Sequence, residues 1–344
     1  MTAKQRMTEA RRQGEFAAER LVTELKLPGG RQIDVFGIIE EMEVWLFFQE
    51  LRGILGVYLA GPPAGILINS GRSVGVQRLT AAHELGHHYL NHGGGIDDDI
   101  SLRAAPGRRT GEARRLTFEA YLKEIAAQAF AMSFLAPAQL VRDMMSNLGI
   151  ARDVTPRPEK VYELSLHLGI SYEATAHRLV ALREIGPSNL DQVLIEPAKA
   201  KLVIGHGHKP ENSRADVWPI SSRQTGALIH AHVGDELALS LDEIPSSGYR
   251  WKLELDLDGF AVRLDDFVSS DNKGEIPRAG SKGQRQITLR VLRPGENRVR
   301  LNCVQAWRPQ DAANQFFIMV DAEELAGKER SLRPSARRAF VEAT

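Results

Sequence analysis

The feature that most constrains this chain is an H-E-x-x-H motif, which lies within Leu79-Thr80-Ala81-Ala82-His83-Glu84-Leu85-Gly86-His87-His88-Tyr89-Leu90. Residues four apart lie on one face of an α-helix, so His83 and His87 can bind a single metal ion. The spacing therefore predicts a helix that carries two zinc ligands. Glu84 would lie beside the ion without binding it, where it can act as a general base on water whose pKa zinc lowers.

The neighbours of the motif distinguish a metal site from a chance match. Many of the residues around the motif are apolar or small, which predicts a buried helix. These residues are Leu79, Ala82, Leu85, Gly86 and Leu90. Two imidazoles and a carboxylate are costly to bury unless they have partners, and a metal ion is such a partner. A chance match on a His-rich amphipathic helix is the alternative, and the apolar context favours the metal site.

Composition limits the remaining classes of function. The 344 residues are enough for two domains, and Lys+Arg and Asp+Glu are both 44, so no overall attraction to nucleic acid or to membranes is expected. The single cysteine, Cys303, excludes an intrachain disulfide and a thiolate metal cluster. Residues 1–20 are charged, and no apolar run approaches the length of a membrane span. We therefore expect a soluble, cytoplasmic protein.

Hydrophobic periodicity predicts a small sheet and several helices around the motif. A mixed-charge loop is expected between His92 and Arg109. A small sheet that leads into an H-E-x-x-H helix is typical of a minimal zinc peptidase. Besides the motif helix, we expect a helix over 14–27, a short helix that begins at residue 33, and a long helix over 112–135. The expected strands are 44–48, 56–60 and 65–69.

The second long helix carries Glu124-Ile125-Ala126-Ala127-Gln128-Ala129-Phe130-Ala131, and Leu135-Ala136-Pro137 follows it. With Arg78 to His87, this pattern resembles the ImmA/IrrE family of metallopeptidases over about residues 14–187. The resemblance implies a gluzincin-like zinc site with Glu124 as third ligand, and a regulatory protein such as a transcriptional repressor as substrate. From the residues alone, the alternative third ligands are Glu112, Glu119 and His92.

The metzincin class is excluded, because Leu90 and Gly93 stand where its motif needs Gly and His.

Residues 159–185 predict a helix, a turn at Gly169 and a second helix with Ser171 as its N-cap. This segment resembles a helix-turn-helix, which the ImmA/IrrE family also carries. The second helix has a meagre basic face, which argues for a packing role and against DNA as a partner. Its charged residues and histidine are Glu173, His177, Arg178, Arg183 and Glu184.

From Trp218 onward, alternating short segments and turns predict an all-β, immunoglobulin-like sandwich. The expected domains are 1–196 and 216–324, joined by a linker over 197–215 and followed by a basic tail over 325–344. His206 and His208 are expected in a solvated loop. The expected strands are 227–232, 236–241, 249–255, 260–266, 284–292, 297–305 and 315–320.

Three segments of this second part resemble the loops of the chagasin family of cysteine-peptidase inhibitors, over about residues 217–324. The resemblance implies that the loops form a rigid wedge that fills the cleft of a papain-like cysteine peptidase. A sandwich that keeps the fold and binds another molecule is the alternative. The residues that carry the resemblance are Pro245, Ser246, Ser247, Gly248 and Tyr249, then Gly280 to Gly283, then Trp307, Arg308 and Pro309.

The sequence thus predicts an α+β protein: a gluzincin-like metallopeptidase domain with helix-turn-helix-like helices, followed by the β-sandwich. The predicted function is a Zn2+-dependent endopeptidase with an appended inhibitor or peptide-binding domain. The alternative is a cysteine-peptidase inhibitor in which the metal domain is regulatory or inactive. A DNA-binding regulator is a third hypothesis, against which the thin basic face argues.

Overall fold

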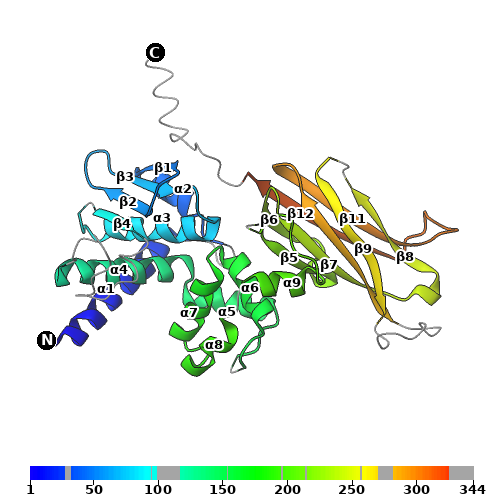
Figure 1. Cartoon of the computed structure of the whole chain (residues 1–344), viewed down its shortest axis with the longest axis horizontal. Coiled ribbons are helices and arrows are strands. Elements are labelled where there is room, and N and C mark those ends of the chain that lie inside the picture. Colours follow the sequence, from blue (N-terminus) through cyan, green and yellow to red (C-terminus); the bar gives the residue numbers. More distant parts are fainter. Residues whose placement is uncertain are drawn as a thin grey trace, which may run out of the picture. The chain divides into compact units, whose positions relative to one another are not determined.

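The computed structural model describes residues 1–27, 32–93, 95–98, 117–152, 154–194, 197–213, 215–255, 258–269 and 282–324. The chain divides into two compact units, Met1–Leu194 and Ile195–Leu325. The first combines helices with a small sheet, and the second consists mainly of β-strands (Figure 1). The predicted α+β class is confirmed.

The sheet of the first unit has four strands in the order β1-β3-β2-β4. β1 pairs parallel with β3, whereas β2 pairs antiparallel with β3 and β4. We expected a loop where β4 forms, because β4 begins at the last residue of a glycine run. Its extended form depends on pairing with β2. The strands are β1 (Trp45–Gln49), β2 (Ile54–Leu59), β3 (Gly65–Asn69) and β4 (Gly95–Asp98).

Three long helices lie to one side of this sheet (Figure 1). The motif helix α3 (Val74–Tyr89) packs against β2 and β3 on one side and against α4 (Phe118–Leu135) on the other (Figure 1). α1 (Ala3–Glu24) packs along α4. It begins well before residue 14, where we expected it, because Thr2 and Gln5 form a capping box ahead of the charged first turns.

The other helices of this unit include the helix-turn-helix-like pair α6 and α7. The left-handed turn at Gly169 (φ 64°) ends α6, and the Ser171 hydroxyl caps α7. α7 is largely buried, and Arg178 donates to the Ala136 carbonyl at 2.8 Å, so this side chain supports packing. The helices are α2 (Val35–Glu41), α5 (Ala138–Asn147), α6 (Pro158–Leu168), α7 (Tyr172–Ala181), η1 (Pro187–Asn189) and α8 (Leu190–Val193).

By length and composition alone, the segment Phe118–Asn147 could cross a membrane. We expected no apolar run as long as a membrane span. The segment reaches this length because it combines two helices, α4 and α5, which Ala136 and Pro137 separate. Within it, 56% of the most apolar stretch is buried inside the protein. Its apolar composition therefore fits a core helix that packs between α1 and α3.

The second unit contains two four-stranded sheets, ordered β5-β7-β10-β9 and β6-β12-β11-β8. All seven expected strands form, and β5 is additional. Pro219 interrupts the alternation of β5, and a proline is tolerated there because β5 is an edge strand. The elements are β5 (Val217–Ser221), η2 (Ser222–Gln224), β6 (Leu228–His232), β7 (Glu236–Glu243), η3 (Pro245–Ser247), β8 (Tyr249–Leu255), β9 (Phe260–Ser269), β10 (Gly283–Val291), β11 (Gly295–Gln305) and β12 (Asn314–Glu323).

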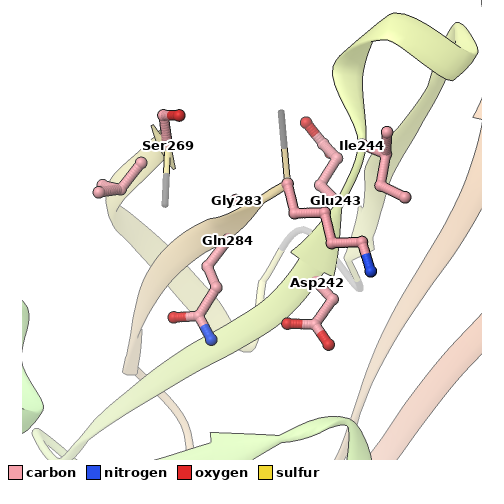
Figure 2. A pocket seen from close by; sticks show the side chains of 8 residues that line it. Asp242, Glu243, Ile244, Ser269, Gly283 and Gln284 are labelled. Atoms are coloured by element: carbon pink, nitrogen blue, oxygen red, sulfur yellow. The ribbon is translucent and has the colours of Figure 1, made fainter. Parts of the chain in front are cut away.

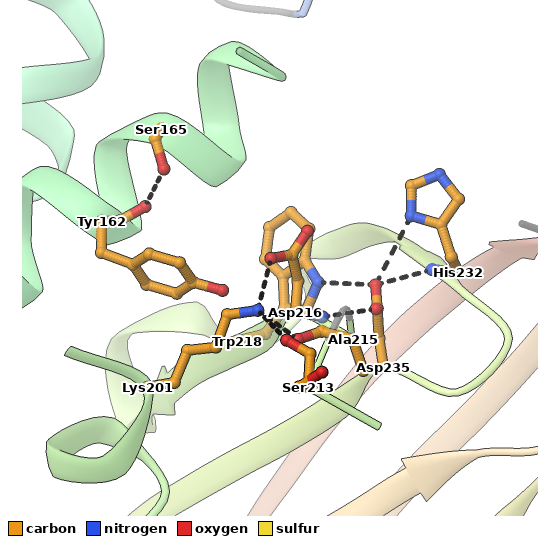
Figure 3. A network of polar contacts seen from close by, with 9 residues as sticks. All are labelled: Tyr162, Ser165, Lys201, Ser213, Ala215, Asp216, Trp218, His232 and Asp235. Carbon is orange, nitrogen blue, oxygen red and sulfur yellow. Dashed lines mark hydrogen bonds and ion pairs between the residues drawn. The ribbon is translucent and has the colours of Figure 1, made fainter. Parts of the chain in front are cut away.

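The segment that we expected to be a linker is partly helical. α9 (Pro197–Ile204) packs on β5, and Lys201 is buried with its Nζ donating to the Ala215 carbonyl at 2.5 Å (Figure 3). The buried Asp235 carboxylate accepts hydrogen bonds from the backbone N–H groups of Asp216 (2.7 Å) and His232 (2.9 Å). These contacts fix the beginning of the sandwich to α9.

Candidate metal centre and loop end of the sandwich

The structure brings His83, His87 and Glu124 together, although Glu124 is far from the motif in sequence. Their ligand atoms lie within 4.8 Å of one another. His83 Nε2 is 3.1 Å from His87 Nε2 and 3.2 Å from Glu124 Oε2, and His87 Nε2 is 3.5 Å from Glu124 Oε1. Three donors on two facing helices therefore point at one place.

Small residues allow this close approach of the two helices. A methyl group added at Gly86 would lie 3.3 Å from the Ala127 Cα and 3.0 Å from the Phe130 ring. Gly86 and Ala127 each lie three residues after a ligand, His83 and Glu124 respectively, and so almost one turn further along the helix. The contact between these small residues thus places Glu124 opposite both histidines.

The three side chains suit zinc. Two imidazoles and a carboxylate are a ligand set that Zn2+ uses in catalytic sites, where a fourth position stays open. The rival ligands are placed elsewhere: the Glu119 side chain is 67% exposed and pairs with Arg6 at 2.6 Å, and His92 contacts His87 through Nδ1 and not on the Nε2 side. Glu112 lies outside the described residues.

The electrostatics of the cluster favour an ionised Glu124. Burial by itself would raise the pKa of this carboxyl group, but hydrogen bonds and charge from His83 and His87 outweigh burial and hold the pKa well below its usual range. Burial, followed by the charge of His87, lowers the pKa of His92 to about 4. At neutral pH the site therefore offers a carboxylate and a neutral His92.

Glu84 is 1% exposed and faces strand β2. A methyl group at Gly56 would lie 2.9 Å from Glu84 Oε1 and 2.5 Å from Thr80 Cγ2, so the β2 backbone approaches the carboxylate directly. Two residues along, the Tyr58 hydroxyl and His88 Nδ1 are 2.9 Å apart. Sequence reasoning missed both contacts, because only the pairing of β2 over α3 creates them; a glycine inside an apolar strand was the available signal.

In the sandwich, two of the three predicted loops lie at one end and touch. The Gln305 side chain donates to the Ser247 carbonyl at 3.3 Å, and a methyl group at Gly248 (φ 76°) would lie 2.5 Å from the Trp307 ring. Trp307 is 67% exposed and Tyr249 is half-buried. Ser246, Arg308 and Pro309 are exposed, and Pro245 is half-buried.

The third predicted loop is described only in part. Gly280 lies outside the described residues, whereas Gly283 is buried at the start of β10, paired with Glu243 and Ser269. Beside it, a pocket of about 420 Å³ opens at this end of the sandwich (Figure 2). Ile244, immediately before the first loop, is one of its lining residues.

Comparison with known families separates the same two parts of the chain. Residues 40–180 match the family model described as the IrrE N-terminal-like domain, a peptidase family, and residues 230–320 match the chagasin family peptidase inhibitor I42. Both resemblances are confirmed. The IrrE-like match contains His83, Glu84, His87 and Glu124, and the chagasin-family match contains the loops. The chain therefore has a metallopeptidase-like part and an inhibitor-like part.

The solved structures that are similar to this chain include one named as a cysteine protease inhibitor. The cysteine protease inhibitor EhICP2 of Entamoeba histolytica is 20% identical, with a TM-score of 0.28, over 32% of this chain and 96% of that chain. Amebosin is 19% identical, with a TM-score of 0.27, over 32% and 98%. PbICP-C, solved in complex with falcipain-2, is 15% identical, with a TM-score of 0.23, over 32% and 100%. No curated protein matches the chain.

Proposed function

We propose that this protein is a cytoplasmic, zinc-dependent endopeptidase with an appended inhibitor domain. The observation that carries the proposal is the convergence of His83, His87 and Glu124 on one point, beside the buried Glu84. A bound zinc ion would polarise the scissile carbonyl group and lower the pKa of a water molecule.

The roles of the protein residues follow from where they lie. His83, His87 and Glu124 would hold the ion, and the ionised Glu124 would offset part of its charge. Glu84 would accept a proton from the attacking water and pass it to the leaving amine. Since Gly56 leaves no side chain between β2 and Glu84, the strand backbone restricts how far this carboxylate can move.

The substrate class that we propose is a regulatory protein, such as a transcriptional repressor, and it rests on the IrrE-like match. DNA is not part of the proposal. In α7, Arg178 is buried and hydrogen-bonded, whereas Glu173 and His177 are exposed, so the described surface of this helix is not basic.

The test of the enzyme proposal is Glu84→Gln, which keeps the volume of the side chain and removes the base. Zinc content and melting temperature should stay unchanged, while cleavage of a library of unstructured peptides, followed by mass spectrometry, should fall at least about 100-fold. Glu119→Gln is the matched control, since Glu119 is exposed on α4. Cleavage by Glu84→Gln at the wild-type rate would refute the assigned role of Glu84.

A second function, inhibition of a papain-like cysteine peptidase, is favoured by the exposed Trp307 beside Gly248 at the loop end. Rigid aromatic anchors bind at little cost in entropy. Full-length Glu84→Gln protein in the presence of a chelator should still inhibit papain, because inhibition by this wedge needs no metal. Trp307→Ala should weaken inhibition at least about tenfold, as expected for loss of an aromatic anchor.

Phe16→Ala is the control for Trp307→Ala, because Phe16 lies on α1 and is 68% exposed, against 67% for Trp307. Absence of inhibition by the folded protein at high micromolar concentration would leave the sandwich with a fold and no assigned partner.

A further inference from the structure

The C-terminal end of the motif helix has a defined geometry. α3 ends in a left-handed Asn91 (φ 53°). The Asn91 N–H donates to the His88 carbonyl at 3.1 Å, and the His92 N–H donates to the His87 carbonyl at 3.0 Å. These two bonds form a Schellman motif, which reverses the chain and folds the second residue after the cap back onto the last turn.

The residue that this motif folds back is His92, and it meets His87. Their Nδ1 atoms are 3.1 Å apart, and their rings cross at 70° with centroids 5.2 Å apart. A contact of this length between two imidazole nitrogens requires one donor and one acceptor. Because His87 Nε2 faces Glu124 and must offer its lone pair to a metal, the ring proton belongs on His87 Nδ1, and His92 Nδ1 accepts it.

His92 is also held from the second ligand-bearing helix. Lys123, the residue before Glu124, donates from Nζ to the His92 carbonyl at 2.7 Å. The position of His92 is therefore fixed by α3 through the Schellman motif and by α4 through Lys123. Both attachments hold the backbone of His92, and together they present its imidazole to His87 from a fixed position.

We propose that His92 is a positioning residue of the metal site: it accepts the Nδ1–H of His87 and thereby fixes the tautomer and orientation of that ligand. The inference rests on the proposed zinc function and deepens it. Partners of metal-bound histidines are typically carboxylates, carbonyl groups or water, and their loss typically weakens metal binding about 10- to 100-fold. Here an imidazole takes that place.

The test compares two variants of full-length protein by zinc competition against a chromophoric chelator. His92→Leu fills similar space without an acceptor, and zinc should bind about 10- to 100-fold more weakly. In His92→Asn, the amide oxygen can take the place of Nδ1, so zinc affinity should stay within about threefold of wild type. The visible spectrum of the cobalt-substituted protein should shift in His92→Leu and not in His92→Asn.

Circular dichroism melting shows whether each variant is folded. Wild-type zinc affinity in folded His92→Leu would overturn the inference and leave the zinc proposal intact. Equal losses in both variants would show that the shape of the ring matters and its acceptor does not, which also overturns the inference. Wild-type protein that binds no zinc would overturn both proposals. If His92→Leu does not fold, the folded His92→Asn variant provides the test. A loss of zinc affinity beyond about tenfold in His92→Asn would contradict the acceptor role.

Discussion

The contact between Gly56 and Glu84 predicts that a substitution of Gly56, which has no side chain, lowers the rate of catalysis. In Gly56→Ala, the new methyl group would lie 2.9 Å from Glu84 Oε1, 2.5 Å from Thr80 Cγ2 and 3.2 Å from the Leu67 carbonyl. Two of these contacts are shorter than real Cβ contacts, so β2 or the side chains of α3 must shift. Either shift changes the position of the Glu84 carboxylate relative to β2.

Two magnitudes follow for Gly56→Ala. Overpacking of this kind costs about 1–3 kcal/mol of unfolding free energy, and about 2 kcal/mol would lower the melting temperature by about 4–8 °C in a unit of this size. A misplaced general base costs about 100-fold or more in rate. Zinc content should not change, because the three atoms nearest to the methyl group belong to Thr80, Glu84 and Leu67 and not to a ligand.

Calorimetry, zinc content and peptide cleavage measure these effects together. Gly65→Ala is the matched control in the same sheet, since its methyl group would meet only ordinary contacts at 3.8 Å and 3.9 Å from Trp45. The double variant Gly56→Ala/Thr80→Ser removes the methyl of Thr80 and isolates the contact with Glu84. Wild-type cleavage by Gly56→Ala, or full recovery of cleavage in the double variant, would refute the argument that Gly56 positions Glu84.

The remaining predictions concern the sandwich. Gly248→Ala places a methyl group 2.5 Å from the Trp307 ring at a residue with φ 76°. The substitution should therefore lower the melting temperature of the sandwich and weaken papain inhibition. Gly234→Ala is the control: Gly234 also has a positive φ but has open space around it, so this substitution should affect stability alone. Burial by itself lowers the pKa of His232, but the hydrogen bond and charge of Asp235 outweigh burial and raise it above its ordinary 6.5 (Figure 3). This contribution to stability is fully present below pH 6.5 and is lost as pH rises through the raised pKa. Chemical denaturation should therefore show the stability difference between wild type and His232→Gln shrinking as pH rises above 6.5, and a constant difference would contradict the His232–Asp235 pairing.

Much of the fold follows from local patterns in the sequence. The alternation of apolar and polar residues in the second unit predicted seven strands, and all seven form. The spacing of the H-E-x-x-H motif predicted a helix, and the motif lies in α3. The misses have physical causes. β4 is extended only because it pairs with β2, Pro219 disguises β5, and the early start of α1 depends on the capping box at Thr2.

The candidate site was only partly accessible from sequence for a similar reason. Helical spacing relates His83 to His87, and the family resemblance pointed to Glu124 among several candidate acids. The supporting contacts join segments that are distant in sequence or depend on a helix end: Gly56 with Glu84, Tyr58 with His88, and His92 with His87. Spacing within one element cannot reveal contacts that arise from strand-on-helix packing or from a Schellman motif.

The most direct test of the zinc centre is metal content, measured by plasma mass spectrometry on purified wild-type, His83→Ala, Glu124→Ala and Glu119→Ala proteins. The structure predicts about one zinc per chain in wild type and in Glu119→Ala, and loss of zinc in His83→Ala and Glu124→Ala. Unchanged zinc in Glu124→Ala together with its loss in Glu119→Ala would contradict the account.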